Sequence, residues 1–336
     1  MLRLVTAKVK GKEAVGMLVD DDVILLAEAY ARLLRRQGKK RTKGVTKNPM
    51  PTNMIDFIKG GERLLGLAEK CIEFVEKAGL RKNRGKTGVV LRKNQYQLLA
   101  PIPRPPSVFT MAVNNRRAFK ASLGENASGN PLVVMKAPAS VIGDQETIFI
   151  PSHIKHAGPE IEFAVVIGKP GQYISKDRAF DHVFGYTIFN DMTAYDLLNE
   201  DVLMHGPLPH EREPGRQSTE LTGRYTYGAF RAKSQHGFTP IGPTIATKGS
   251  IDPVNVEMWC KVNGETVQHG RPNEYAFSIP DVLAFLSTII PLLPGDIVSM
   301  GRVSPEHQDL KDGDLMECHG EGIGTLRNPI RVGRRG

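Results

Sequence analysis

From residue 107 onward the chain consists of short apolar runs separated by glycine, proline, asparagine and aspartate. Runs such as "IEFAVVIG", "VFGYTIFND", "GPTIATKG" and "GDIVSM" are long enough for one strand and short for a helix. Many short strands with turn residues between them are typical of a mostly β domain, either a rolled sheet or a barrel. We expect two helices to interrupt this domain, at residues 192–203 and 278–290.

The N-terminal part of the chain has a different pattern. Its first thirty residues alternate apolar and polar side chains and are broken by "KGKE" and "DDD", which indicates short antiparallel strands. Residues 51–78 carry apolar residues at helical spacing and end at Gly79, a common helix stop. The proline-rich stretch "APIPRPPSVF" disfavours both helix and central strand. We therefore predict a small α+β domain over residues 1–100 and a mostly β domain with some helix over residues 101–336.

The composition is that of an ordinary globular protein. The 336 residues are 40% hydrophobic and 24% charged, which is enough for a sizeable core. No apolar run approaches the roughly 20 residues that cross a bilayer, and the start lacks the apolar stretch of a secretory signal. The three cysteines, Cys71, Cys260 and Cys318, show no metal-ligand spacing. Sparse cysteines indicate a reducing compartment, so we expect a cytoplasmic protein without a membrane partner.

The net charge of +9 raises the question of nucleic acid binding. Much of the excess lies in residues 35–47 and 81–86, which are polar, turn-rich and without aromatic residues for base stacking. These segments are typical of solvated loops, and we expect no nucleic acid partner. A basic surface would still attract an anionic substrate.

Three carboxylates follow an unusual pattern. Glu160 and Glu162 lie one residue apart in an apolar strand-like run, so their side chains point to the same face. Asp191 ends the next apolar run. Buried together, such anions repel and need a positive partner, and oxygen ligands select Mg²⁺, Mn²⁺ or Ca²⁺. The spacing alone leaves a second interpretation open, in which the glutamates are solvated and Asp191 caps the following helix.

The motifs of this part of the chain resemble the fumarylacetoacetate hydrolase family. The matching stretches appear in the family's order: "PEIEFAVVIGK", "GYTIFNDMTAYD", "AKS" followed by "PIGPTIAT", "VNGETVQ", "PGDIV" and "LKDGDLMECHGEGIGTLRNPI". The N-terminal stretch is similar to the small domain that precedes this one in many members. The resemblance implies a rolled β-sheet, a homodimer and a divalent cation, usually Mg²⁺, held at the positions of Glu160, Glu162 and Asp191.

The resemblance also implies the substrate class and further site residues. Family members act on small 2-oxo or 1,3-dioxo acids such as fumarylacetoacetate and acylpyruvates, with the metal as Lewis acid. Lys233 in "AKS" matches a family lysine near the metal, which can pair with substrate anions or transfer a proton if its pKa is lowered. Gln268 in "VNGETVQ" matches a position near the substrate.

The chain departs from the hydrolytic members of the family at the water-activating pair. Those members carry a motif like N-Y-x-x-H-x-x-E, and the corresponding stretch here is "VNNRRAFKAS". Asn114 and Arg116 fit and are predicted to bind substrate, but the histidine and glutamate fall at Ala118 and Ala121, which cannot take a proton. Five histidines are considered as replacements: His153, His156, His205, His210 and His236.

Two further substitutions concern the substrate's carboxylate. The family's "D-x-S/T-A-R-D" has an arginine where this chain has Tyr195, and its "T-G-T-P" loop appears as "MGRVSP" with Arg302 at the second threonine. We expect Arg302 to replace the missing arginine as a bidentate clamp. Tyr195 can donate a hydrogen bond to substrate or pack on its helix. The polar stretch 205–228 is predicted to be a loop over the site.

These features predict a metal-dependent enzyme that hydrolyses a C–C bond of a fumarylacetoacetate-like or acylpyruvate-like acid. The lost pair keeps open a lyase or isomerase, such as a 2-oxo-3-deoxy sugar acid dehydratase, an oxaloacetate-type decarboxylase or an enol–keto isomerase, because these reactions need no hydrolytic water. A third alternative is a non-catalytic metal-containing binding protein.

Overall fold

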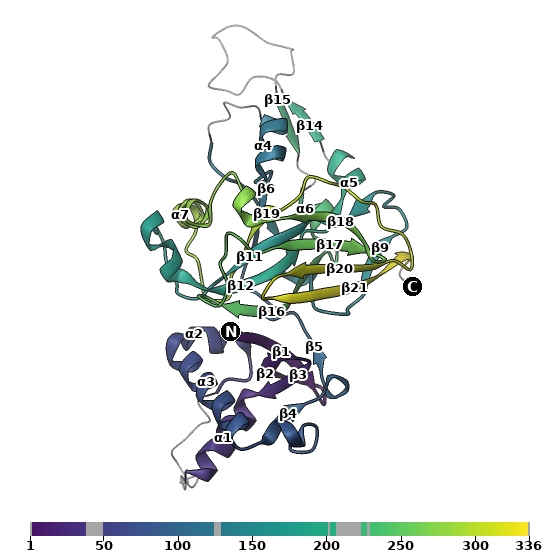
Figure 1. The fold of residues 1–336 in the computed structure, drawn as a ribbon. Helices are drawn as coiled ribbons and strands as arrows, with labels where there is room; N and C mark the ends of the chain where they lie inside the picture. The colour runs from purple at the N-terminus through teal and green to yellow at the C-terminus, as the bar shows by residue number, and fades with distance from the viewer. Residues whose placement is uncertain are drawn as a thin grey trace.

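The structure is a computed structural model that describes residues 2–37, 50–123, 129–200, 202–205, 223–226 and 229–334. The N-terminal hundred residues form the smaller part at the bottom of Figure 1, and the rest forms the larger part above it. The described elements of the smaller part are β1 (Arg3–Val9), β2 (Lys12–Val19), β3 (Asp22–Leu25), α1 (Leu26–Arg36), α2 (Met54–Lys59), α3 (Gly61–Lys77), the 3₁₀ turns η1 (Leu80–Asn83) and η2 (Lys93–Gln95), β4 (Val90–Leu91) and β5 (Gln97–Leu98).

The larger part contains strands of the main sheet and a second sheet. The main sheet takes β6 (Val108–Ala112), β7 (Leu132–Lys136), β8 (Val141–Ile142), β11 (Ile161–Ile167), β12 (Val183–Asn190), β16 (Thr239–Thr247) and β19 (Ile297–Arg302). The second, five-stranded sheet has the order β18-β17-β20-β21-β9. Its strands are β9 (Ile148–Pro151), β17 (Met258–Val262), β18 (Glu265–Gly270), β20 (Leu315–Gly320) and β21 (Gly324–Gly333).

The main sheet continues through both parts of the molecule. Its order is β4-β3-β2-β1-β16-β12-β11-β19-β6-β7, with β5 beside β1 and β8 beside β16. The link is the antiparallel pair β1–β16, in which Leu4 lies opposite Ile245. The predicted boundary at residues 100 and 101 therefore crosses a hydrogen-bonded sheet, and the division into two domains stays a prediction. Neither large sheet closes on itself, so of the two expected shapes the open, rolled sheet is found.

The central strands of the main sheet are buried on both faces. All seven residues of β11 are buried, which explains why the sequence reads as a continuous apolar run. Phe163 and Val165 belong to the core shared with the second sheet, while Ala164 and Val166 belong to the core shared with α2 and α3. The N-terminal helices α2 and α3 thus cover one face of β11 in the larger part.

The remaining helices and short strands lie around the ends of the main sheet. They are β10 (Ala157–Gly158), which pairs with β13 (Thr193–Ala194), the hairpin β14 (Val202–His205) and β15 (Gly223–Thr226), the 3₁₀ turns η3 (Pro138–Ser140), η4 (Lys176–His182) and η6 (Pro272–Glu274), and the helices α4 (Arg116–Leu123), α5 (Tyr195–Glu200), α6 (Ala229–Lys233) and α7 (Ile279–Ile289). Figure 1 shows α4 and the hairpin at the upper end of the molecule.

Most of the expected elements are present. The N-terminal strands, the helices within residues 51–78 and helix α7 are confirmed. The helix expected over residues 192–203 is only α5, because β13 precedes it and β14 follows it. The stretch 205–228, expected to be a loop over the site, begins at the last residue of β14 and includes β15, and its remaining residues lie outside the described ones.

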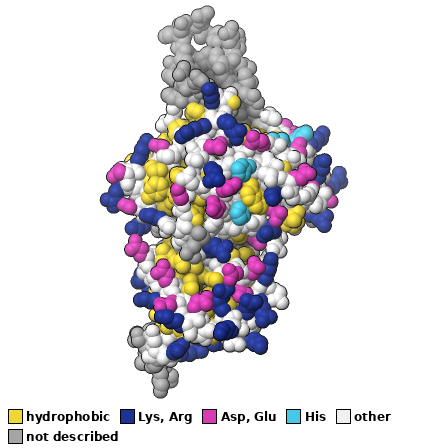
Figure 2. Space-filling view, in the orientation of Figure 1, with side chains coloured by type: hydrophobic (Ala, Val, Ile, Leu, Met, Phe, Trp, Pro, Cys, Tyr) yellow, Lys and Arg dark blue, Asp and Glu magenta, His cyan; other side chains and the backbone are white. Residues whose placement is uncertain are grey.

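The visible face of the molecule carries side chains of both charges. On the face shown in Figure 2, lysine and arginine side chains are interspersed with acidic ones rather than collected in one stripe. Among the described helices, none has the length and apolar character that a membrane span needs.

Candidate metal centre and active site

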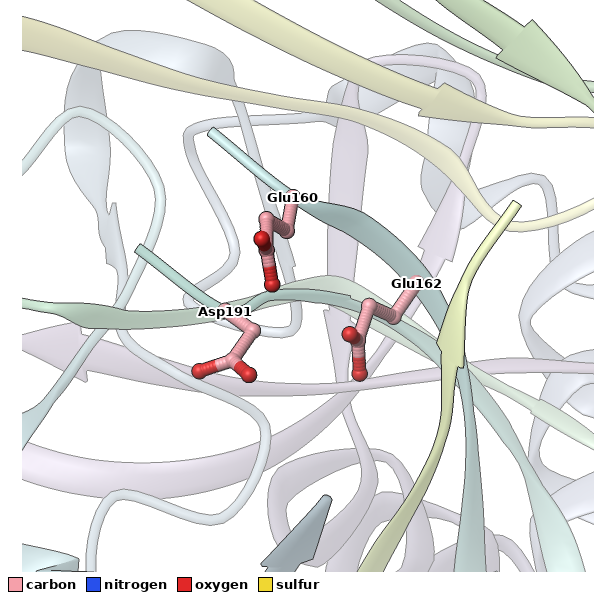
Figure 3. A group of neighbouring side chains, drawn as sticks. All are labelled: Glu160, Glu162 and Asp191. Carbon is pink, nitrogen blue, oxygen red and sulfur yellow. The ribbon is translucent and has the colours of Figure 1, made fainter. Parts of the chain in front are cut away.

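The three predicted carboxylates lie together where β11 begins and β12 ends. Glu160 directly precedes β11, Glu162 is its second residue, and Asp191 directly follows β12. The strands pair antiparallel, and the Asp191 N–H donates to the Glu160 carbonyl at 2.9 Å. Oxygen atoms of the three carboxylates lie within 4.8 Å of one another. Figure 3 shows the carboxyl groups facing a common space. Asp191 does not cap a helix, since α5 begins only at Tyr195.

Lys233, the last residue of α6, binds two of these carboxylates. Its ammonium group donates to Asp191 Oδ2 at 2.7 Å, to Glu160 Oε2 at 3.0 Å and to the Thr193 hydroxyl at 2.7 Å, so each of its three protons has an acceptor. Burial opposes the charged form, but the carboxylates of Asp191 and Glu160 outweigh it and raise the pKa of Lys233 above its usual value. Lys233 is therefore a charge partner of the two carboxylates in this arrangement, and the catalytic role expected for it stays a prediction.

Lys136 is a second buried lysine at the site, and the sequence reasoning missed it. It ends β7, is only 1% exposed, and donates to Asp191 Oδ1 at 2.5 Å and to the Phe238 carbonyl at 2.7 Å. Burial alone would raise the pKa of Asp191, but Lys136 and Lys233 hold it below its usual value. The sequence feature that could have indicated Lys136 is its place at the end of the apolar run "PLVVMK". Without further information, however, a lysine is expected to be exposed.

Glu162 is the most enclosed of the three acids. It is 1% exposed and accepts hydrogen bonds from the Thr110 hydroxyl at 2.8 Å and the Ser299 hydroxyl at 2.5 Å. Burial, together with the charges of Asp191 and Glu160, raises the pKa of Glu162 to about 8. Such a carboxylate favours a proton or a bound cation over the bare anion.

Glu160 connects the buried acids to the surface. The Tyr195 hydroxyl donates to Glu160 Oε1 at 2.9 Å, and an Arg302 guanidinium nitrogen lies 3.6 Å from the same oxygen. Burial and the nearby Glu160 keep the pKa of Tyr195 above its usual value, so its hydroxyl stays a donor. Both residues line a cleft of about 800 Å³, whose walls are His156, Tyr195, Asp196, Asn199, Glu200, Arg302, Pro305, His307 and Asp309.

Gln268 lies beside the site but has no free amide group. Its amide nitrogen donates to the carbonyls of Pro159 at 2.8 Å and Glu306 at 2.9 Å, and its oxygen accepts from the Ile161 N–H at 3.0 Å. It is 1% exposed. Gln268 therefore fastens the start of β11 to the segment after β19, and the substrate contact expected for it stays a prediction.

Asn114 and Arg116 also bind backbone. Asn114 is buried, and its side chain donates to the Met300 carbonyl at 2.7 Å and accepts from the Phe277 N–H at 2.8 Å. Arg116 donates to the Tyr275 carbonyl at 3.1 Å. Both side chains hold the end of β6 against neighbouring segments, and neither lines the cleft.

The positions of the expected water-activating pair lie on α4, where Ala118 is buried and Ala121 is exposed. Of the five histidines considered as replacements, His156 lines the cleft. His153 is exposed, and His236 pairs with the Ala139 carbonyl at 3.2 Å. The side chains of His205 and His210 lie outside the described residues.

A second histidine, which was not among these five, also lines the cleft. His307 lies in the segment after β19 and packs edge-on against the ring of Tyr195, with ring centroids 4.3 Å apart. No sequence motif indicated His307, because it lies more than a hundred residues from Tyr195 in the sequence and the two side chains meet only in the folded chain.

The donor set fits a hard divalent cation. Three carboxylates from two paired strands offer oxygen ligands, the type that Mg²⁺, Mn²⁺ and Ca²⁺ prefer. Charge alone does not require the ion, because Lys136 and Lys233 already neutralise part of the cluster. We expected a metal cation to be the positive partner of the three carboxylates. The structure corrects this expectation, because the two lysines supply part of the positive charge.

Comparison with known proteins assigns the family. Residues 107–331 match the family model described as fumarylacetoacetate (FAA) hydrolase, C-terminal. The chain belongs to the fumarylacetoacetate hydrolase family. Among its relatives, oxaloacetate tautomerase YisK of Bacillus subtilis is 29% identical over 98% of this chain and 100% of that protein. The human mitochondrial oxaloacetate tautomerase is 29% identical over 84% of this chain and 80% of its own.

Solved structures of the fumarylacetoacetate hydrolase family share the fold. The maleylpyruvate hydrolase from Sphingobium sp. SYK-6, in complex with manganese(II) and pyruvate, superposes with a TM-score of 0.69 at 20% identity, covering 99% of this chain and 100% of that one. These comparisons confirm the predicted family, fold and enzyme class, and the named relatives include both hydrolases and tautomerases.

Proposed function

We propose that this family member is a divalent-metal-dependent enzyme that interconverts the enol and keto forms of a short 2-oxo acid, with oxaloacetate as the first candidate. One observation carries this choice. The carboxylate triad is present beside a cleft whose wall residues Tyr195 and Arg302 contact Glu160, while the positions expected for a water-activating pair hold Ala118 and Ala121. Tautomerisation needs a Lewis acid and a proton-transfer group but no activated water. The name of the full-length Bacillus relative supports the same choice.

In this proposal each side chain of the site has a role. Glu160, Glu162 and Asp191 would hold the ion, which acts as a Lewis acid toward substrate oxygens when bound. Lys233 holds Asp191 and Glu160 in place through the hydrogen bonds of its ammonium group. Arg302 offers the substrate's carboxylate a planar pair of donors from the cleft wall.

Mg²⁺ is the expected ion, with Mn²⁺ as an alternative that the manganese complex of the hydrolase supports. We expect calorimetry on chelator-treated protein to show uptake of Mg²⁺ and Mn²⁺, and Ca²⁺ to bind as a larger oxygen-seeking ion. Glu162→Gln should abolish uptake, while Glu265→Gln, at an exposed position on β18, should leave it unchanged. Absence of uptake by the unmodified protein would end the metal proposal.

A homodimeric state and a cytoplasmic location stay predictions.

The decisive experiment follows the enol form of oxaloacetate by ultraviolet absorbance. With Mg²⁺ present, the protein should speed its conversion to the keto form, and Glu162→Gln should abolish the acceleration. The other reactions give different products, since decarboxylation of oxaloacetate yields pyruvate and carbon dioxide. Hydrolysis of an acylpyruvate yields two acids, and dehydration of a 2-oxo-3-deoxy sugar acid removes water.

C–C bond hydrolysis is the second candidate, supported by the shared fold with maleylpyruvate hydrolase. It requires a group that activates water in place of Ala118, and turnover of acylpyruvates without tautomerase activity would establish it. If metal binds and none of these acids reacts, a non-catalytic binding protein becomes the better description.

The carboxylate clamp makes a separate prediction. Arg302→Ala should raise KM for oxaloacetate by about tenfold or more, because one charge-assisted pair of hydrogen bonds contributes on the order of 1.5–3 kcal/mol. Arg302→Lys should recover only part of the loss, since an ammonium lacks the fork geometry. Steady-state kinetics with unchanged KM in both variants would remove Arg302 from substrate binding.

A further inference from the structure

Asp309 binds two histidines on the wall of the cleft. One carboxylate oxygen lies 3.0 Å from His307 Nε2 and the other lies 2.8 Å from His156 Nδ1. An ionised carboxylate only accepts hydrogen bonds, so each imidazole donates its N–H to Asp309. His307 then carries its free electron pair on Nδ1.

A histidine–carboxylate pair by itself is common on protein surfaces. His269 and Glu257 form such a pair on the second sheet at the same 3.0 Å separation. The pair at His307 differs in its surroundings, because it lines the cleft together with Tyr195 and Arg302. Tyr195 connects it to the metal centre, since its ring packs against His307 and its hydroxyl binds Glu160.

The segment that carries His307 is fastened on both sides. Before His307, the Glu306 carbonyl accepts from Gln268, and after it the Leu310 N–H donates to the Ala157 carbonyl at 2.9 Å. A side chain at Gly158 would overlap the Gln308 carbonyl, so this close approach requires glycine. A proton-transfer group needs a fixed position, and these contacts supply one.

We propose that His307, oriented by Asp309, is the proton-transfer residue of this site, in place of the family histidine that is alanine here. The inference rests on the proposed tautomerase function and assigns its missing general acid–base group. Histidine is suited to the role because its unperturbed pKa lies near neutral pH. The Asp309 contact sets the tautomer, as a carboxylate does for other catalytic histidines.

The proton transfer balances without a further reactant. Nδ1 of His307 takes a proton from C3 of the 2-oxo acid, and the electron pair of that C–H bond becomes the C2–C3 double bond. The carbonyl π pair moves to the C2 oxygen, giving an enolate. The imidazolium returns its proton to that oxygen, giving the enol and the neutral imidazole, and the reverse sequence gives the keto form.

Other groups near the cleft fit this role less well. Lys233 uses all three protons on acceptors within the site. Both histidines are exposed, His156 more so (62% of its side chain against 42% for His307), and the hydrogen bond of His156 to Asp309 raises its pKa above the usual value. The titratable and charged groups that line the cleft with His307 are Asp309, His156, Tyr195, Arg302, Asp196 and Glu200.

The test compares His307→Gln, Asp309→Asn and the matched control His269→Gln in the full chain with Mg²⁺. For enol-to-keto conversion of oxaloacetate, His307→Gln should lower kcat about 10²–10⁴-fold, the usual contribution of a general acid–base group. Its pH–rate profile should lose the limb that the unmodified enzyme shows near neutral pH. Asp309→Asn should lower kcat less, with KM nearly unchanged, and His269→Gln should match the unmodified enzyme.

Measuring metal uptake shows whether a variant has lost only its proton-transfer group or has a damaged metal site. His307→Gln should bind Mg²⁺ as the unmodified protein does. If it retains full activity and an unchanged pH–rate profile while the unmodified enzyme is active, the role of His307 is overturned and the proposed function stands. If the unmodified protein accelerates none of these conversions, the proposed function fails, and the assignment of His307 fails with it.

Discussion

At the scale of single residues, the centre is a buried cluster of opposite charges. Asp191 lies between two ammonium groups, and Glu162 is surrounded by hydroxyl donors. Each group depends on the others, because a buried charge that loses its partner costs several kcal/mol. The site is therefore also a determinant of stability, and substitutions in it must be tested for folding before activity is interpreted.

Lys136→Met tests this dependence. Methionine fills a similar volume without the charge, so Asp191 loses one of its two ammonium partners and the Phe238 carbonyl loses its donor. We expect the free energy of unfolding to fall by about 3–5 kcal/mol, as for other broken buried ion pairs. Urea denaturation measures it. Lys70→Met, at an exposed position of α3, should change stability by less than about 0.5 kcal/mol. Equal effects of the two substitutions would contradict the role given to Lys136.

At the scale of elements, the short strand β10 positions the cleft wall. It pairs with β13 just before α5, and the segment after β19 packs against it. The side chains Tyr195 and His307 meet because these segments are held in register. The arrangement has little spare room, since Gly158 and Gly270 both approach backbone carbonyls of residues 303–308.

Gly158→Ala should disturb this packing. Its methyl group would overlap the Gln308 carbonyl and displace the segment that carries His307. We expect a loss of about 1–3 kcal/mol in stability, typical of overpacking, and at least a tenfold loss of kcat. Gly66→Ala is the matched control, because no atom lies near its added methyl group on α3 and helix propensity favours alanine by up to about 1 kcal/mol. Urea denaturation and enol-to-keto kinetics give the comparison. Full activity of Gly158→Ala would show that the segment tolerates displacement.

At the scale of the whole molecule, the N-terminal part is an extension of the main sheet. Strand β1 covers the edge of β16, and α2 and α3 share a core with Ala164 and Val166 of β11. The strand that carries Glu162 is therefore buried on one face by the N-terminal part. We expect the two parts to unfold together rather than as independent domains.

Leu4→Ala tests this coupling. Leu4 is fully buried at the β1–β16 junction, and its truncation should cost about 2–5 kcal/mol. Trp259, the sole tryptophan, lies on β17 of the second sheet and reports on the larger part. Its fluorescence midpoint in urea should fall together with the far-ultraviolet circular dichroism midpoint. A fluorescence midpoint that stays in place would instead indicate two independent domains. Leu315→Ala, on an exposed side chain, should move neither.

The sequence by itself determined the strand-rich class, the family and the meeting of the three carboxylates. Strand periodicity places Glu160 and Glu162 on one face, and the antiparallel pairing of the next apolar run returns Asp191 to the same end. Those relations are local or join neighbouring strands, so the spacing suggested them, and the resemblance to the family decided between the metal site and a solvated strand face. The backbone hydrogen bonds of Gln268 and Asn114 were not predicted, because a motif records that a residue is near the site and not which atoms it binds.

Only the tertiary structure decided what surrounds the carboxylates. Lys136 reaches Asp191 and His307 reaches Tyr195 from distant parts of the chain, and β1 joins β16 across more than two hundred residues. Such contacts have no periodicity or spacing, since they depend on how strands roll and how loops pack against them. The charge balance of the centre, its candidate base and its N-terminal support are therefore properties of the packed molecule.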